Sequence, residues 1–141
     1  MKKLLYTLLA VSIIFSACEK EESNSNSNLN INVSNMTGIW EATSFIINDG
    51  ELANSNTIRY WLKADMTIEE NIQNSSSNNI NSNTGIWEIN ESNLIIEWFT
   101  AERTTYQITS LNNTSVSLLL VEWLEDEEVV DISISASFEK Q

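Results

Sequence analysis

The chain has 141 residues, of which 20 are acidic and 7 are basic, and its net charge at pH 7 is −13. It contains no histidine, no proline and a single cysteine, which excludes histidine-based triads, imidazole metal ligands and disulfides within the chain. Because its lysines and arginines are scattered along the chain, it lacks the basic patch that nucleic-acid binding requires, and we expect no nucleic-acid partner.

The first 18 residues have the pattern of an export signal. Lys2 and Lys3 precede an apolar stretch, residues 4–15, that is too short to span a bilayer as a stable anchor. Two small residues then lead to Cys18, whose thiol can accept a diacylglyceryl group. This pattern resembles the signal peptides of bacterial lipoproteins, with Phe15 where leucine is usual. The resemblance implies removal of residues 1–17 and lipidation of Cys18; the alternative is a buried thiol.

Four charged residues follow the cysteine: Glu19, Lys20, Glu21 and Glu22. They resemble the lysine–acidic export signal of Bacteroidetes surface lipoproteins, which implies an outer-membrane location facing the cell exterior. A solvated spacer is the alternative interpretation. Anionic headgroups repel an acidic chain, so we expect membrane association through the acyl chains alone.

Residues 23–35 consist mainly of serine and asparagine, with too little apolar surface to offset the entropy of ordering the chain. We therefore expect a flexible tether over residues 18–35, which would hold the domain on the order of 20 Å from the lipid. Leu29, Ile31 and Val33 alternate with polar residues, so a short edge strand is the alternative. The remaining residues, 36–141, are enough for one domain.

Residues 36–141 alternate between apolar and polar side chains and show no apolar period of 3.6 residues. This pattern predicts eight strands, at residues 37–48, 57–63, 66–73, 85–89, 93–100, 104–108, 115–123 and 130–139. Turn signals separate most of them, at residues 48–50, 64–65, 74–83, 90–92, 112–113 and 125–128. Short antiparallel strands joined mostly by tight turns predict an all-β fold, either an up-and-down barrel or a sandwich, and barrel closure removes the exposed edges.

The sequence Thr-Gly-Ile-Trp-Glu occurs twice, at residues 37–41 and 84–88. We expect each copy to open a strand, where glycine allows a bend or a close backbone approach. Trp40 and Trp87 would then fill the core from the starts of two strands. Five identical residues leave open whether this is a true internal repeat.

Several short motifs follow one another along the chain: Gly38-Ile39-Trp40, the turn at 48–50, Thr84-Gly85-Ile86-Trp87 before Asn93-Leu94-Ile95-Ile96, and Tyr106-Gln107-Ile108 with Leu111. Over residues 36 to about 138 the chain resembles the lipocalin-like domains of Bacteroidetes lipoproteins. The resemblance implies a small eight-stranded up-and-down antiparallel barrel that binds a small hydrophobic molecule or lipid. The chain is shorter than full lipocalins, and a barrel of this size is either filled by its own side chains or holds one small ligand.

The candidate ligand-binding residues are large aromatic side chains that the alternation turns inward: Trp40, Tyr60, Trp87, Trp98 and Tyr106. They either line an apolar cavity or fill the core.

Two other classes of function remain open. Trp61, Phe99 and Trp123 are predicted to point outward and, with the acidic run at 125–128, could form a protein-interaction module such as an inhibitor or adhesion accessory. That run could also bind Ca²⁺, although a solvated hairpin tip explains it too. A hydrolase would need two facing carboxylates, yet Glu88 and Glu97 are predicted to point outward. We therefore predict no catalytic residue, cofactor or metal site, and a non-catalytic, lipid-anchored binding protein.

Overall fold

The computed structural model describes residues 29–51, 56–77 and 79–141. The predicted signal peptide, Cys18 and most of the predicted tether lie outside the described residues. The elements are α1 (Val33–Met36), β1 (Gly38–Ile47), β2 (Gly50–Glu51), β3 (Asn56–Leu62), β4 (Thr67–Asn74), β5 (Ile80–Asn90), β6 (Asn93–Trp98), β7 (Glu102–Leu111), β8 (Ser115–Glu125), β9 (Glu128–Val129) and β10 (Ile134–Lys140). No helix in this part of the chain is long and apolar enough to cross a membrane.

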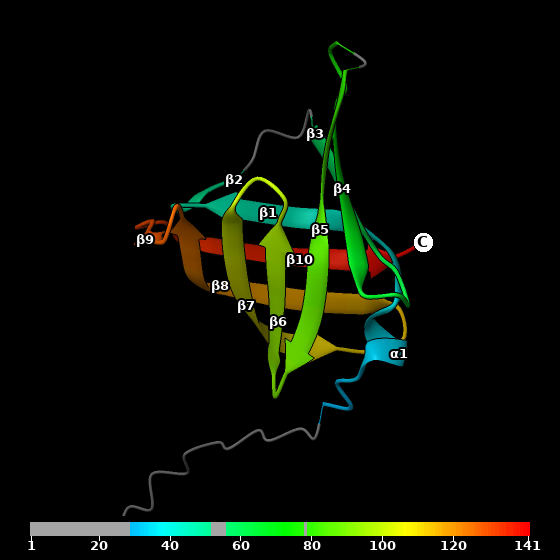
Figure 1. Ribbon diagram of the computed structural model, residues 1–141. Coiled ribbons are helices and arrows are strands. Elements are labelled where there is room, and N and C mark those ends of the chain that lie inside the picture. Colours follow the sequence, from blue (N-terminus) through cyan, green and yellow to red (C-terminus); the bar gives the residue numbers. More distant parts are fainter. Residues whose placement is uncertain (1–28, 52–55, 78) are drawn as a thin grey trace, which may run out of the picture.

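Eight long antiparallel strands close into a barrel (Figure 1). The sheet runs in the order β10, β1, β3, β4, β5, β6, β7, β8, and β10 also pairs with β8, which closes the ring. The short strands β2 and β9 add to β1 and β8. The predicted all-β, eight-stranded, up-and-down antiparallel barrel is therefore confirmed.

The strand boundaries differ most from the sequence prediction at the starts of β5 and β10. β5 begins at Ile80, inside the run predicted to be a turn, because backbone pairing with β4 continues through polar residues as far as Gln73 and Ile80. This hairpin arm projects beyond the barrel (Figure 1). The second Thr-Gly-Ile-Trp-Glu copy consequently lies in the middle of β5 and does not open it. β10 begins at Ile134 and not at residue 130, because Val130 and Ile132 make local backbone bonds.

The strands run between two ends, which we call the base and the far end. At the base, α1 packs across the interior, Met36 is fully buried, and Trp40 Nε1 donates to the Met36 carbonyl at 2.7 Å. Residues 33–36 are thus helical, and the alternative of an edge strand through Val33 is wrong. The far end is where β1, β4, β6 and β8 finish and β3, β5, β7 and β10 start.

A β-bulge at Val121 turns Trp123 toward the barrel interior, opposite to the predicted direction. Thr105 pairs with Glu122 but Tyr106 pairs with Leu120, so β8 contains one extra residue at this point. One extra residue reverses the alternation beyond it. Leu118 and Trp123 therefore both pack against the core, although they are an odd number of residues apart. The expectation that Trp123 points outward is wrong for this reason.

Candidate functional site

All five candidate aromatic residues lie in the single hydrophobic core, and none is more than 7% exposed. Trp40 and Trp87 belong to the base, where their polar atoms are satisfied. Trp40 Nε1 donates to Met36 O, and Trp87 Nε1 donates to Lys63 O at 3.1 Å. These two indoles have the packing and hydrogen bonding of structural core residues.

Tyr60 lies directly opposite Trp40 and links the other two candidates, Trp98 and Tyr106. Its ring stacks on Phe138 with 5.0 Å between ring centroids, and it packs edge-on against Trp98 at 6.2 Å. Its hydroxyl is within hydrogen-bonding reach of Tyr106, which comes from β7. Since β3 and β7 are not neighbours in the sheet, the two tyrosines meet across the barrel interior.

Glu70 is an interior residue that the sequence analysis missed. It pairs directly with Tyr60 across β3 and β4 and lies on the same face of β4 as Ile68 and Ile72. The alternation therefore contained the signal, but an acidic side chain is normally assigned to the outer face. The hydroxyl of Tyr60 lies near the Glu70 carboxyl. We refer to Tyr60, Glu70 and Tyr106 as the Glu70 cluster.

Burial dominates the electrostatics of this cluster. It raises the pKa of Glu70, a hydrogen bond from Tyr60 lowers that pKa, and the nearby Glu102 carboxylate raises it further. Burial also raises the pKa of Tyr60 well above its usual value and the pKa of Tyr106 to about 12. Both phenols are consequently protonated near neutral pH and are available as hydrogen-bond donors.

Unpartnered polar atoms gather toward the far end. Among the described residues, the buried side-chain atoms without a hydrogen bond are Asn56 Oδ1, Arg103 Nε, Thr104 Oγ1 and Trp123 Nε1. Arg103 lies on the outer face, 3.9 Å from Glu97. Asn56 begins β3, where this strand pairs with β4 and not with β1. Thr104 and Trp123 face the barrel interior. Thr104 is 4% exposed; its Oγ1 lies near the Tyr106 hydroxyl but makes no hydrogen bond of normal geometry.

The far half of the interior also has an apolar rim. Six hydrophobic residues near this end pack against the core but are only partly buried: Phe45, Ile47, Ile72, Leu120, Trp123 and Ile132. The barrel is thus sealed by α1 at its base and less completely packed at the far end. The arrangement combines apolar walls with a carboxyl, two phenols and two unpartnered polar atoms.

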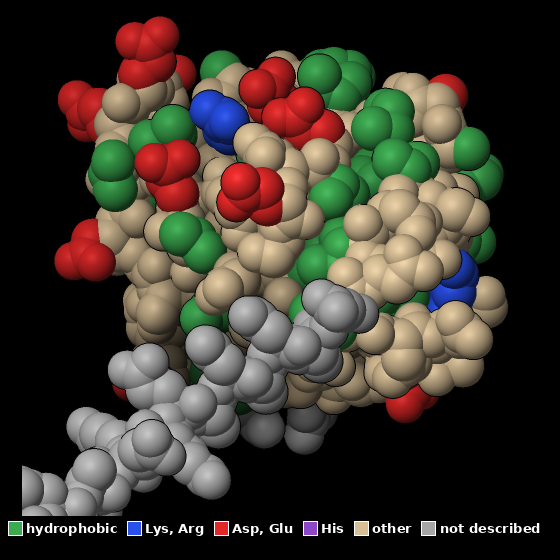
Figure 2. Space-filling view, turned by 90° about the horizontal axis from the view of Figure 1, so that it is seen from below, with side chains coloured by type: hydrophobic (Ala, Val, Ile, Leu, Met, Phe, Trp, Pro, Cys, Tyr) green, Lys and Arg blue, Asp and Glu red, His purple; other side chains and the backbone are tan. Residues whose placement is uncertain are grey.

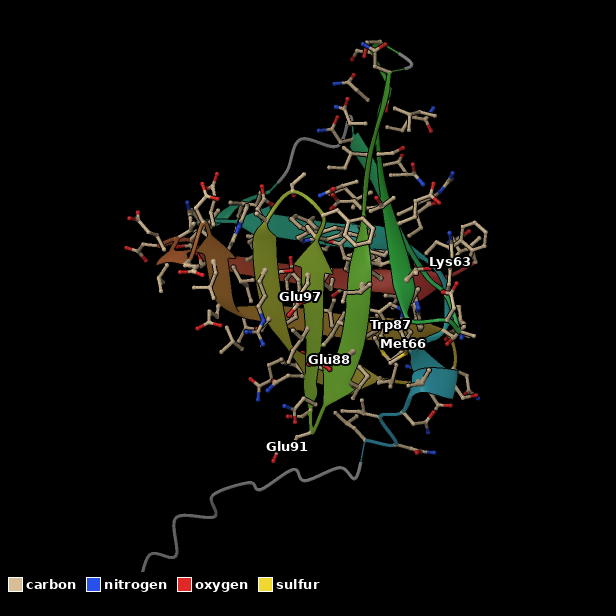
Figure 3. The ribbon with its side chains drawn as sticks, viewed as in Figure 1. Lys63, Met66, Trp87, Glu88, Glu91 and Glu97 are labelled. Carbon is tan, nitrogen blue, oxygen red and sulfur yellow. The ribbon has the colours of Figure 1, made fainter. Side chains whose placement is uncertain are left out.

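A separate groove of about 300 Å³ lies over β5 and β6 and is lined by Met66, Ile86, Trp87, Glu88, Ile95 and Glu97 (Figure 3). Glu88 and Glu97 point outward, as predicted. Glu88 pairs with Ile95 and Glu97 pairs with Ile86, so each acid lies opposite an apolar residue and not opposite the other acid. The groove therefore does not present a pair of facing carboxylates.

Trp61, Phe99 and Trp123 do not form one surface patch. Trp61 is 44% exposed beside Ile39 on the outer face, and Phe99 is 72% exposed beyond the end of β6. Trp123 packs inward. The acidic run forms the exposed tip between β8 and β9, and the described residues contain no group of three or more acids or cysteines placed to hold a metal ion.

Comparisons with known proteins support the fold of this chain but do not assign the chain to a protein family. No protein-family model matches the chain, and no curated protein sequence matches it. An uncharacterized protein from Bacteroides eggerthii has a similar structure, with 12% identity and a TM-score of 0.53, over 74% of this chain and 98% of that one. The chain is an eight-stranded barrel of that general architecture.

Two further structures are similar at a lower level. The bovine lipocalin allergen Bos d 2 shares 10% identity over 79% of this chain and 76% of its own, with a TM-score of 0.49. A de novo designed fluorescence-activating β-barrel shares 17% identity over 77% and 96%, with a TM-score of 0.45. These scores are too low to add to what the Bacteroides protein shows about the fold.

Proposed function

We propose that this protein is a non-catalytic binding protein that takes one small, largely apolar molecule into the far half of its barrel. We further propose that a lipid on Cys18 holds it at the outer membrane, facing the cell exterior. The observation that carries the binding role is the pair of unpartnered polar atoms inside the far half, on the cross-strand partners Thr104 and Trp123.

Unpartnered buried polar atoms are costly, at about 1–3 kcal/mol each, so a filled core normally avoids them. The base follows this rule, because both of its indoles donate to carbonyls. The far half does not. A bound molecule with polar groups would satisfy these atoms, while Trp98 and the partly buried apolar rim would contact its body.

The anchor part of the proposal rests on the N-terminal sequence alone. Lys2 and Lys3, the apolar residues 4–15 and Cys18 follow the order of a lipoprotein signal. The acidic character of the chain argues against electrostatic attachment to anionic lipid, since acidic side chains outnumber basic ones on the surface seen in Figure 2. An acyl chain would supply the attachment instead.

Native mass spectrometry of the intact chain, purified from its host membrane, tests the binding role. We expect a co-purifying small molecule with the wild type and with Thr105→Tyr, whose side chain lies on the outer face. We expect the molecule to be lost with Thr104→Tyr, which fills the far half from the adjacent position. If all three proteins show only the mass of the protein without a bound molecule, the binding role is contradicted.

The alternative of a protein-interaction module loses its main support, because its three candidate aromatic residues lie in three different environments. The expectation that the protein is not an enzyme stays a prediction.

A further inference from the structure

We propose that the ligand is a small amphiphilic cation, an apolar body bearing a protonated amine, which the Glu70 carboxylate holds between Tyr60 and Tyr106. This inference rests on the proposed function, because it concerns the same half of the barrel. It adds the chemical class of the ligand and names Glu70 as the residue that binds its charged group.

The first argument is that the interior carries negative charge without a protein counter-ion. The groups around Glu70 come from three strands: Tyr60 from β3, Asn83 from β5, and Glu102 and Tyr106 from β7. The set contains a second carboxylate and no basic side chain. An isolated carboxylate in such a site is disfavoured unless a cation accompanies it.

The described basic residues are all occupied elsewhere. Arg59 lies 2.7 Å from Glu41, Lys63 lies 3.6 Å from Glu69, and Arg103 lies 3.9 Å from Glu97, all on the outer face. At the base, Lys140 Nζ is 3.4 Å from the Asn35 carbonyl and 5.1 Å from the centre of the Trp40 ring. Within the described part of the chain, no basic side chain is therefore free to neutralise Glu70.

The second argument is the hydrogen-bonding character of the unpartnered atoms, which is independent of the charge. Thr104 Oγ1, on a residue that is 4% exposed, is unpartnered and can accept a hydrogen bond. It lies near the Tyr106 hydroxyl, so it and the Glu70 carboxylate offer acceptors on the two sides of the cluster, which suits an ammonium group with three donors. Tyr60 and Trp98 add aromatic rings against which a cation or its apolar body can pack. Trp123 Nε1 can only donate, so an oxygen on the ligand would complete the site.

Three probes with one phenylbutyl body test the proposal: 4-phenylbutylamine, 4-phenylbutanol and 4-phenylbutyrate. Binding is measured by isothermal titration calorimetry on the full chain in phosphatidylcholine nanodiscs, with the heat from empty nanodiscs subtracted. We expect the amine to bind at least tenfold more tightly than the alcohol and the carboxylate to bind most weakly. Amine affinity should fall as the pH is lowered through the pKa of Glu70, because protons compete with the amine for the carboxylate.

Glu70→Gln keeps the size of the side chain and removes its charge. We expect it to weaken amine binding at least tenfold, about 1.4 kcal/mol, and to change alcohol binding less than twofold. Glu88→Gln on the outer face is the matched control and should change neither. If Glu70→Gln fails to fold by circular dichroism, Glu102→Gln replaces it, with an expected loss of two- to fivefold for the amine alone.

Equal affinity for amine and alcohol, or unchanged amine binding in the folded Glu70→Gln variant, would overturn the cation proposal. The binding function would still be supported if native mass spectrometry finds a co-purifying molecule. If none of the three probes binds, the cation proposal is also overturned. The binding function itself is overturned only if native mass spectrometry shows the protein without a bound molecule.

Discussion

Glu70 on β4 lies directly opposite Tyr60 on β3, with both side chains turned into the barrel. This pair places an ionisable carboxyl beside a buried aromatic ring, with no basic side chain among its neighbours. Burial of such a group weakens the fold when the group is charged and prepares the site for a cation. The same residue should therefore affect stability and binding in opposite directions.

Glu70→Gln should make the unliganded protein more stable near pH 8. The folded-state pKa of Glu70 is raised by burial above its unfolded value of about 4.5, so ionisation favours the unfolded state. This penalty is absent below the unfolded pKa and is fully present above the folded pKa. Thermal unfolding from pH 4 to pH 8 should show the variant's advantage growing with pH. A lower Tm for the variant near pH 8 would contradict the prediction.

Met36→Ala should destabilise the protein by about 2–5 kcal/mol, because the fully buried Met36 side chain seals the base and its loss leaves a cavity. Urea denaturation measures this change. Val129→Ala is the control, since Val129 is 73% exposed, and it should change the free energy of unfolding by less than about 0.5 kcal/mol. Similar effects of both substitutions would argue against α1 as a seal.

Gly85→Ala should cost about 3 kcal/mol, because a Cβ at this position would collide with the Glu97 carbonyl and lie 3.0 Å from Trp98 Cα. Both obstacles are backbone atoms of the paired strand β6, which cannot move aside as a flexible side chain can. Gly50→Ala is the matched control, with its nearest contact at 3.4 Å. Chemical denaturation of the two variants would refute the argument if Gly50→Ala were the more damaging.

Glu127→Gly should stabilise the protein by about 1 kcal/mol, because Glu127 adopts φ of 67° in the tip between β8 and β9, where glycine is not strained. Glu128→Gly removes the same charge from a paired strand residue and should be destabilising. Thermal unfolding of the two variants separates the backbone effect from the charge effect. Equal shifts in Tm would show that charge alone matters.

Cys18→Ala should abolish labelling by radioactive fatty acid and leave an unprocessed precursor, because the thiol is the proposed site of acylation. Moving the cysteine into the tether, with Cys18→Ala and Ser25→Cys together, should not restore the label. Whole-cell labelling followed by gel electrophoresis measures both. Label that persists in either variant would show that the N-terminal interpretation is wrong.

The alternation of apolar and polar residues along the chain predicted most of the strands of the barrel. The two-residue alternation located all eight long strands, since a half-buried strand needs one apolar face regardless of what lies across from it. Asn48 and Asp49 similarly marked the first hairpin, and both adopt positive φ there. The inward direction of Trp40, Tyr60 and Tyr106 followed from the same alternation.

Tertiary pairing decided the features on which the proposed site depends. Trp123 turns inward because β8 gains a residue at Val121 relative to β7, and a bulge depends on the partner strand. Tyr60 and Tyr106 meet because the sheet closes on itself and brings β3 and β7 face to face. The sequence by itself determined which residues could face the interior; only barrel closure decided which of them meet, because that depends on register and curvature over the whole sheet.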